Sequence, residues 1–305
     1  MKNFLNIFVF ILSLISTAHA SGMEKLWETS GFSMPESIVT SENDDWIYVS
    51  NVNADKKGFI SRLSKDGKVD SYKWLAGLNN PAGLALFDNK LYVGDSTQVH
   101  IIDVKKAKLL KSISSKEAKA LNDVTISKQG QVFVSDIATG KVFTIKEDKL
   151  VVWFESAEIK HPNGLFVQDN HLFIADFASK LSHDLKVDDY GSIYKVSLFT
   201  KSFRKIPSSH HLGGLDGLVS LNNTLFVSSN PTGELFIITD KEKVLIKSFE
   251  KGLADISISE ETLFAPFIFS GKVSSYSLKG LNVTSSEMRL KLEKGKGISV
   301  VYDNQ

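Results

Sequence analysis

The segment His171-Leu172-Phe173-Ile174-Ala175-Asp176 predicts a buried β-strand, because apolar and aromatic residues fill its centre and a polar residue ends it. A shorter segment, Asn163-Gly164-Leu165, comes before it and predicts a preceding strand. After it, Gly191-Ser192-Ile193-Tyr194-Lys195 reads as a glycine-marked turn followed by another strand. Together the three segments predict consecutive strands of one antiparallel sheet.

The first two strands of this unit occur six times along the chain of 305 residues, and in five of the six a glycine-marked turn and a further strand follow. Its first strands begin at Glu36, Ala82, Asn122, Asn163, Asp216 and Ala254. Successive starts lie 46, 40, 41, 53 and 38 residues apart, which is typical of propeller blades of about 40–50 residues. A β-sandwich also contains many short strands, but it does not repeat one unit in phase. We therefore predict an all-β fold, a six-bladed β-propeller.

The blade pattern also predicts how the ring closes and how many domains there are. The fourth interval is long because the segment from Phe177 to Tyr190 is inserted between two strands. We expect Glu24 to Ser30 to pair beside the strands that follow Gly271, which would join both ends of the chain in one blade. No linker or low-complexity stretch interrupts residues 21–305, so we predict a single domain.

Residues 1–20 have the features of a signal peptide. Lys2 supplies the positive charge, Phe4 to Ile15 is mostly apolar, and Ala18-His19-Ala20 is a cleavage pattern. An uncleaved anchor is the alternative, but the apolar run is shorter than the ~20 residues of a spanning helix. Because the chain has no cysteine, it has no disulfides, and a bacterial periplasm fits it better than eukaryotic secretion.

The composition excludes some partners. The 36 basic and 35 acidic side chains leave the chain near neutrality, without the basic footprint of a nucleic-acid-binding protein. Residues 21–305 contain no further run that could span a membrane. Propellers are usually complete as single chains, so we expect a monomer that binds a small-molecule substrate or ligand.

The starts of the first strands should form a ring at one end of the central channel, since the first strand of each blade lines that channel. The ring would contain Glu36, Asn122, Asn163 and Asp216, with alanine in the other two blades and Asp123 and Asp255 one position further on. Converging carboxylate and amide oxygens suit a divalent cation: Ca²⁺ best, with Mg²⁺, Mn²⁺ and Zn²⁺ as alternatives. Alternatively, these residues only cap turns.

The ring motifs resemble those of the senescence marker protein, gluconolactonase and luciferin-regenerating enzyme family of six-bladed propellers. Glu36-Ser37-Ile38-Val39, Asn122-Asp123, Asn163-Gly164-Leu165 and Asp216-Gly217 match that family's motifs in the same blades and order. The resemblance implies that Glu36, Asn163 and Asp216 bind a metal and that Asn122 contacts substrate and, in relatives, metal. It also implies that Asp216 acts as the general base of a lactonase.

Three departures weaken the match for an acidic-sugar substrate. Ala120 stands where family lactonases carry an arginine, Ile38 and Thr40 replace a proline and a tryptophan, and Val124 replaces a glycine. Each change removes part of the sugar-acid pocket and leaves the metal ring intact. The prediction is therefore a lactone or ester hydrolase with no specified substrate.

In this hydrolase the bound cation would polarise the carbonyl, and Asp216, or Asp123 in its place, would accept the proton of the attacking water. His210 and His211 precede the Asp216 strand and are candidate substrate contacts, although such a pair is more often solvated surface. No Gly-x-Ser-x-Gly elbow and no phosphate-binding glycine loop occurs.

Two non-hydrolase readings stay open. The chain could be a platform for ligands or proteins, with a structural cation in its channel. A strictosidine-synthase-like propeller is a third reading, which Glu36 and Asp216 disfavour.

A second set of acidic residues has a structural interpretation. Asp95, Asp136 and Asp176 each end the second strand of a blade. We expect their carboxylates to accept hydrogen bonds from neighbouring turn amides.

Overall fold

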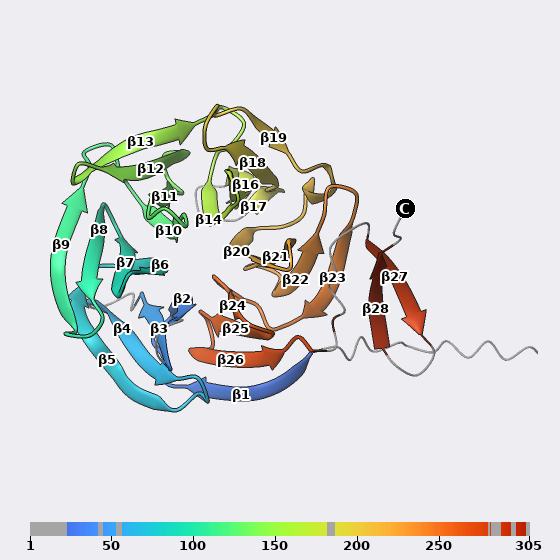
Figure 1. Cartoon of the computed structure of the whole chain (residues 1–305), viewed down its shortest axis with the longest axis horizontal. Helices are drawn as coiled ribbons and strands as arrows, with labels where there is room; N and C mark the ends of the chain where they lie inside the picture. The colour runs from blue at the N-terminus through green and yellow to red at the C-terminus, as the bar shows by residue number, and fades with distance from the viewer. Residues whose placement is uncertain are drawn as a thin grey trace, which may run out of the picture.

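Six four-stranded antiparallel sheets surround a central channel (Figure 1). This arrangement comes from a computed structural model that describes residues 23–41, 45–52, 57–181, 187–279, 281, 288–293 and 297–302. The predicted signal peptide at 1–20 lies outside these residues. The prediction of an all-β, six-bladed propeller is confirmed.

Each blade runs from an inner strand at the channel to an outer strand at the rim. Blade 1 contains β2 (Pro35–Thr40), β3 (Trp46–Asn51), β4 (Gly58–Ser64) and β5 (Val69–Leu78), and blade 2 contains β6 (Pro81–Phe87), β7 (Lys90–Asp95), β8 (Gln98–Asp103) and β9 (Lys108–Ser114). Blade 3 contains β10 (Leu121–Ile126), β11 (Val132–Asp136), β12 (Lys141–Lys146) and β13 (Lys149–Glu155), and blade 4 contains β14 (Pro162–Gln168), β15 (His171–Asp176), β18 (Ile193–Ser197) and β19 (Phe203–Lys205). Blade 5 contains β20 (Leu215–Leu221), β21 (Thr224–Ser229), β22 (Glu234–Ile238) and β23 (Lys243–Ser248).

Blade 6 closes the ring with strands from both ends of the propeller. Its inner strands are β24 (Ser257–Ser259), β25 (Thr262–Phe267) and β26 (Lys272–Ser277), and its outer strand is β1 (Glu24–Ser30). β1 pairs antiparallel with β26, so the predicted closure is confirmed. Trp27 also donates its indole N–H to the Lys65 carbonyl at 2.9 Å, which ties the closing strand to blade 1.

Six hydrophobic clusters fill the spaces between blades. Each cluster combines residues from two adjacent blades, and one of them joins blade 6 to blade 1 through Phe264, Val273 and Ile47. Burial of this kind is the main favourable contribution to folding. The core is therefore a closed ring of interfaces around the channel.

A β-bulge at the start of the inner strand recurs in blades 1 to 5. In blade 1 the register passes from the pair Pro35–Asn51 to the pair Ile38–Val49, so two residues of β2 face one of β3. The same shift occurs in β6, β10, β14 and β20. Bulges redirect side chains and are frequent beside functional sites. Here they lie at the predicted ring positions.

Serines of the second strands satisfy the backbone at three of these bulges. The Ser50 hydroxyl accepts the Ser37 amide at 2.9 Å, and the Ser135 hydroxyl accepts the Asp123 amide at the same distance. In blade 5 the Ser228 hydroxyl accepts the Gly217 amide at 2.7 Å. The buried N–H groups that a bulge removes from the ladder are thus paired again.

The three carboxylates at the ends of second strands bind turn amides, as predicted. Asp95 accepts the amides of Asn79 and Asn80, and Asp176 accepts that of His161. Asp136 accepts four amides, at 2.6–3.2 Å, from residues 119, 120, 138 and 139. These carboxylates fix the chain as it enters each blade.

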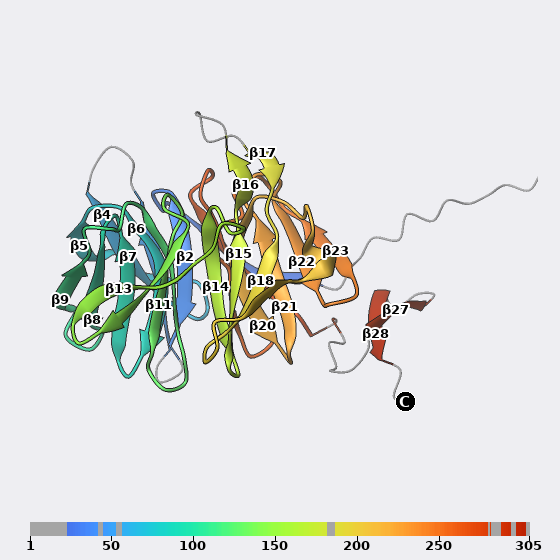
Figure 2. The same ribbon diagram turned by 90° about the horizontal axis from the view of Figure 1, so that it is seen from above.

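Two hairpins lie outside the blades. The inserted segment of blade 4 forms β16 (Ala178–Leu181) and β17 (Val187–Tyr190), which project beyond the blade faces (Figure 2). They follow β15, whose last residue pairs with the first of β14, so this hairpin rises from the face on which the inner strands begin. At the other end of the chain, β27 (Met288–Glu293) and β28 (Gly297–Tyr302) pair only with each other. Within the described ranges, no helix has the length and hydropathy to cross a bilayer.

Candidate functional site

The predicted ring lies where the inner strands begin. Glu36, Asn163 and Asp216 occupy equivalent bulge positions in blades 1, 4 and 5. Their exposed fractions are only 6%, 3% and 5%. The ring therefore encloses a nearly dry cluster of polar side chains at this end of the channel.

Two glycines allow the inner strands to approach closely at the ring. A Cβ at Gly164 would lie 1.9 Å from the Asp216 carbonyl oxygen, and one at Gly217 would lie 2.3 Å from the Ile256 amide nitrogen. Any other residue would push neighbouring inner strands apart. The glycines of the Asn-Gly and Asp-Gly motifs are therefore required by packing around the channel.

Hydrogen bonds fix the amide and one carboxylate of the ring. Asn163 donates its side-chain N–H to the Leu215 carbonyl at 3.2 Å, so its oxygen is directed elsewhere. Asn230 donates to Asp216 Oδ2 at 2.9 Å. Both contacts join the site to blade 5, and the second one orients the Asp216 carboxylate.

Asp123 and Asp255 each come one residue after a ring position, the first in blade 3 and the second in blade 6. Both oxygens of Asp123 accept backbone amides, from Val124 at 2.6 Å and from Leu165 at 2.5 Å. Asp255 Oδ2 accepts the Ser37 hydroxyl at 2.5 Å. These two carboxylates thereby link adjacent inner strands, from blade 3 to blade 4 and from blade 6 to blade 1.

Three buried oxygens of the ring have no hydrogen-bond partner among the residues that the structure describes. They are Glu36 Oε2, Asn163 Oδ1 and Asp216 Oδ1. Buried polar atoms are almost always paired, because leaving one unsatisfied costs about 1–3 kcal/mol. Since all three belong to the ring, one bound group that accepts electron pairs from oxygen could satisfy them together.

The carboxyl groups of this site have raised pKa values. Burial, followed by the charges of Asp216 and Asp123, raises the pKa of Glu36 well above its ordinary value. Burial raises the pKa of Asp216 to about 7, although the amides of Asn230 and Asn163 oppose the rise. Burial also raises the pKa of Asp123 to about 7, against the two backbone amides that bind it. Asp255 shifts in the same direction, through burial and then through the Asp123 and Glu36 charges.

These observations fit a divalent cation. A bound cation would supply the missing partner of the three oxygens and would offset the repulsion between buried carboxylates. Among the residues that the structure describes, no group of three or more His, Cys, Asp or Glu side chains is placed to hold a metal. The candidate set is instead two carboxylates and one amide, which is a hard, oxygen-only set.

Asn122, the fourth predicted metal residue, occupies the corresponding bulge in blade 3 and is half-buried. Its backbone oxygen packs so closely on Gly94 that a Cβ there would lie 2.6 Å away. Its predicted side-chain role, to bind metal or substrate, stays a prediction.

The two predicted substrate histidines lie on the same face, and His211 contacts the inserted hairpin. His211 Nδ1 lies 2.7 Å from Asp189 Oδ1, and the Ser179 hydroxyl donates to the other Asp189 oxygen at 2.6 Å. The His210 and His211 rings stack edge to face at 4.0 Å. About half of the His211 side chain is exposed, so the pair belongs to the rim and is separate from the dry ring. His183 and Asp184 of the insertion lie outside the described residues.

Sequence reasoning missed two partners of the ring. Asn230 follows the second strand of blade 5, one position beyond the residue that in other blades binds turn amides. Ser37 belongs to the blade 1 motif but had no predicted role. Its hydroxyl donates to Asp255 and also accepts the Leu84 amide at 3.2 Å. The repeated polar residue near the end of second strands was the available signal for Asn230.

Comparison with known proteins supports the fold only. No family model matches the sequence, and no curated protein matches it. A solved structure named as a candidate gluconolactonase is 15% identical, with a TM-score of 0.63 over 86% of this chain and 92% of that one. Virginiamycin B lyase from Staphylococcus aureus is 12% identical, with a TM-score of 0.59 over 84% and 99%. A streptogramin B lyase is also 12% identical, with a TM-score of 0.58 over 84% and 97%.

Proposed function

We propose that the chain is an exported, divalent-cation-dependent hydrolase of the gluconolactonase-like type that acts on a lactone or ester. The observation that carries the proposal is the convergence of three unpartnered oxygens, from Glu36, Asn163 and Asp216, at one end of the channel. The likeness to a structure named as a candidate gluconolactonase, at 15% identity, is consistent with it.

In this proposal Glu36, Asn163 and Asp216 would hold the cation, and Ca²⁺ suits their oxygens best. Asn122 would complete the set or contact the substrate. When bound, the cation would act as a Lewis acid on a carbonyl oxygen. Burial of the three side chains excludes water from their oxygens, which strengthens electrostatic interactions there.

Asp216 is the better candidate for the general base. Its Oδ1 would bind the cation, and its Oδ2 accepts only the Asn230 amide, so the second lone pair of Oδ2 can take a proton from water. In Asp123, by contrast, both oxygens accept backbone amides that join blades 3 and 4. If Asp123 took the proton, the oxygen that carries it would become a weaker acceptor for its backbone amide.

Residues 1–20 would direct export, after which the propeller would work as a monomer in the periplasm. His210 and His211, on the rim, would contact the part of the substrate furthest from the cation. The exposure of His211 and its link to the hairpin suit a specificity role.

An activity screen tests the proposal. Protein stripped with a chelator and then supplied with Ca²⁺, Mg²⁺, Mn²⁺ or Zn²⁺ is assayed against lactones and aryl esters. We expect turnover with at least one cation, and its loss in Asp216→Asn. The matched control is Asp70→Asn, which removes a partly exposed carboxylate from an ion pair with Arg62 on blade 1 and should leave turnover unchanged.

The alternative is a non-enzymatic platform in which the cation is structural. The observation in its favour is the burial of the ring, because side chains that are 3–6% exposed leave little room for a substrate. A cation that stabilises the fold without turnover on any lactone or ester would favour this alternative. Turnover that depends on the cation would exclude it.

A further inference from the structure

A cavity lies at the opposite end of the channel from the ring. It has a volume of about 800 Å³, within the range of small-molecule sites. The ends of inner strands β2, β6, β10 and β24 surround it, together with the turns that follow them. We call this cavity the far vestibule, and its charged and aromatic lining residues are Lys65, Phe87, Asp88, Lys128 and Glu260.

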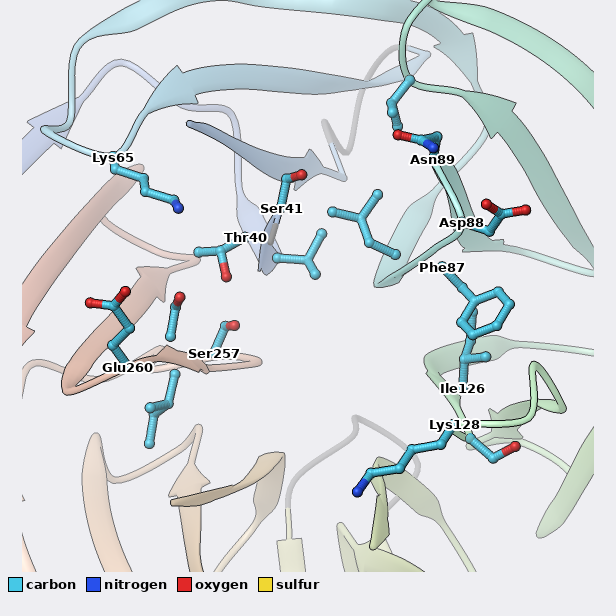
Figure 3. Close-up of a pocket in the computed structure, with 16 residues that line it drawn as sticks. Thr40, Ser41, Lys65, Phe87, Asp88, Asn89, Ile126, Lys128, Ser257 and Glu260 are labelled. Atoms are coloured by element: carbon cyan, nitrogen blue, oxygen red, sulfur yellow. The ribbon is translucent and has the colours of Figure 1, made fainter. Parts of the chain in front are cut away.

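Two exposed lysine side chains bring positive charge to the far vestibule. Lys65 comes from the β4–β5 turn and Lys128 from the β10–β11 turn, and both ammonium ends point into the cavity from different sides (Figure 3). Within the described part of the chain, neither ammonium group has a hydrogen-bond or ion-pair partner. The two acidic residues do not offset them inside the cavity: the Asp88 carboxylate points away from it, and Glu260 lies at its edge on the side of Lys65 (Figure 3).

Apolar and hydroxyl groups complete the lining. The Phe87 ring and Ile126 lie together on one wall, where Phe87 is 36% exposed (Figure 3). The Thr40 hydroxyl lies opposite them. The cavity thus has an exposed aromatic ring on one wall and two unpaired lysine ammonium groups that point into it. This lining suits a ligand that has both a flat apolar part and acidic groups.

We propose that the far vestibule binds a small organic dianion, a dicarboxylate with an apolar ring. One carboxylate would face Lys65 and the other Lys128, and the ring would pack on Phe87 and Ile126. This site is distinct from the cation ring, because β2 runs from Glu36 at the ring to Thr40 at the vestibule. Four residue steps of extended chain separate the two by about 13 Å. The proposal does not depend on hydrolase activity.

Calorimetric titration of the mature protein tests the proposal, with benzene-1,3-dicarboxylate as the probe and its neutral diamide as the comparison. The protein is first stripped of cations with a chelator, and the chelator is then removed. No cation is then left at the ring to bind the probe. The dicarboxylate should bind saturably with one site per chain, and the diamide at least about tenfold more weakly. Lys65→Met and Lys128→Met should each weaken the dicarboxylate about tenfold, as expected for loss of a hydrogen bond to a charged group.

Matched variants distinguish the vestibule from general attraction to lysine. Lys68→Met changes an 83%-exposed lysine of the same turn as Lys65, and it should leave affinity unchanged. Phe87→Ala should weaken both probes. Absence of saturable dicarboxylate binding would overturn the proposal, as would equal affinity for the diamide. Unchanged affinity in both Lys65→Met and Lys128→Met, with the wild-type melting temperature, would also overturn it.

Discussion

Removing the side chain of Asn230 tests how the site holds Asp216. Asn230 donates to Asp216 Oδ2 at 2.9 Å, and Asp216 Oδ1 is one of the three unpartnered oxygens. In Asn230→Ala the Asp216 carboxyl group loses the donor that orients it and that opposes the rise of its pKa. A hydrogen bond to a charged group is worth about 1.5–3 kcal/mol, so the cation should bind roughly 10- to 150-fold more weakly. This range agrees with the roughly 10- to 100-fold effect of losing a group that orients a metal ligand.

Calorimetric titration of chelator-stripped protein with Ca²⁺ measures this effect directly. Asn170→Ala is the control, because Asn170 is an exposed residue of the β14–β15 turn, at the other end of blade 4. It should bind Ca²⁺ as the wild type does. Wild-type affinity in Asn230→Ala would refute the reasoning, since it would mean that Asp216 needs no orientation or does not bind the cation.

Three further predictions concern the framework that positions the site. Asp136→Ala leaves four turn amides without their charged acceptor and should lower the free energy of unfolding by about 3 kcal/mol in urea titrations; a loss below about 1 kcal/mol would contradict the role given to this carboxylate. Gly164→Ala places a methyl group 1.9 Å from the Asp216 carbonyl oxygen, so it should destabilise the fold and abolish the cation-induced rise in melting temperature; a variant that keeps both would show that the strands can move apart freely. Burial raises the pKa of Asp95, but the bonds from His100 and two amides outweigh it and leave the pKa below its ordinary value, so the stability this gives is present above about pH 4 and is lost as pH falls through the lowered pKa. Between pH 6 and pH 3 the urea midpoint of the wild type should therefore fall further than that of Asp95→Asn, and parallel falls would contradict the assignment.

The blade count and the closing strand could be predicted because they depend on local periodicity. Each blade repeats a strand pattern, with a glycine-marked turn in five of the six, and Glu24 to Ser30 is a strand-like segment left over at the start of the propeller. The ring positions followed from the same phase, since Glu36, Asn163 and Asp216 begin inner strands. Local sequence was thus sufficient for the architecture and for which residues share one end of the channel.

The environment of those residues could not be predicted, because it depends on contacts between blades. Asp123 reads as a free carboxylate in the sequence, but the Leu165 amide of the next blade binds it. Asn230 reads as a turn residue, but it holds Asp216 across the bulge. The far vestibule is also invisible in the sequence, since Lys65 and Lys128 come from turns of different blades.

We propose that a divalent cation binds Glu36, Asn163 and Asp216. The direct test is to titrate chelator-stripped protein with each cation and to measure the melting temperature. At about a hundred times the dissociation constant, a bound ligand adds roughly 2.7 kcal/mol, which for a chain of this size is a rise of several degrees. We expect a saturable rise with Ca²⁺ that is lost in Asp216→Asn. If no divalent cation raises the melting temperature, the claim is contradicted, and the three oxygens are only unsatisfied polar atoms of the propeller.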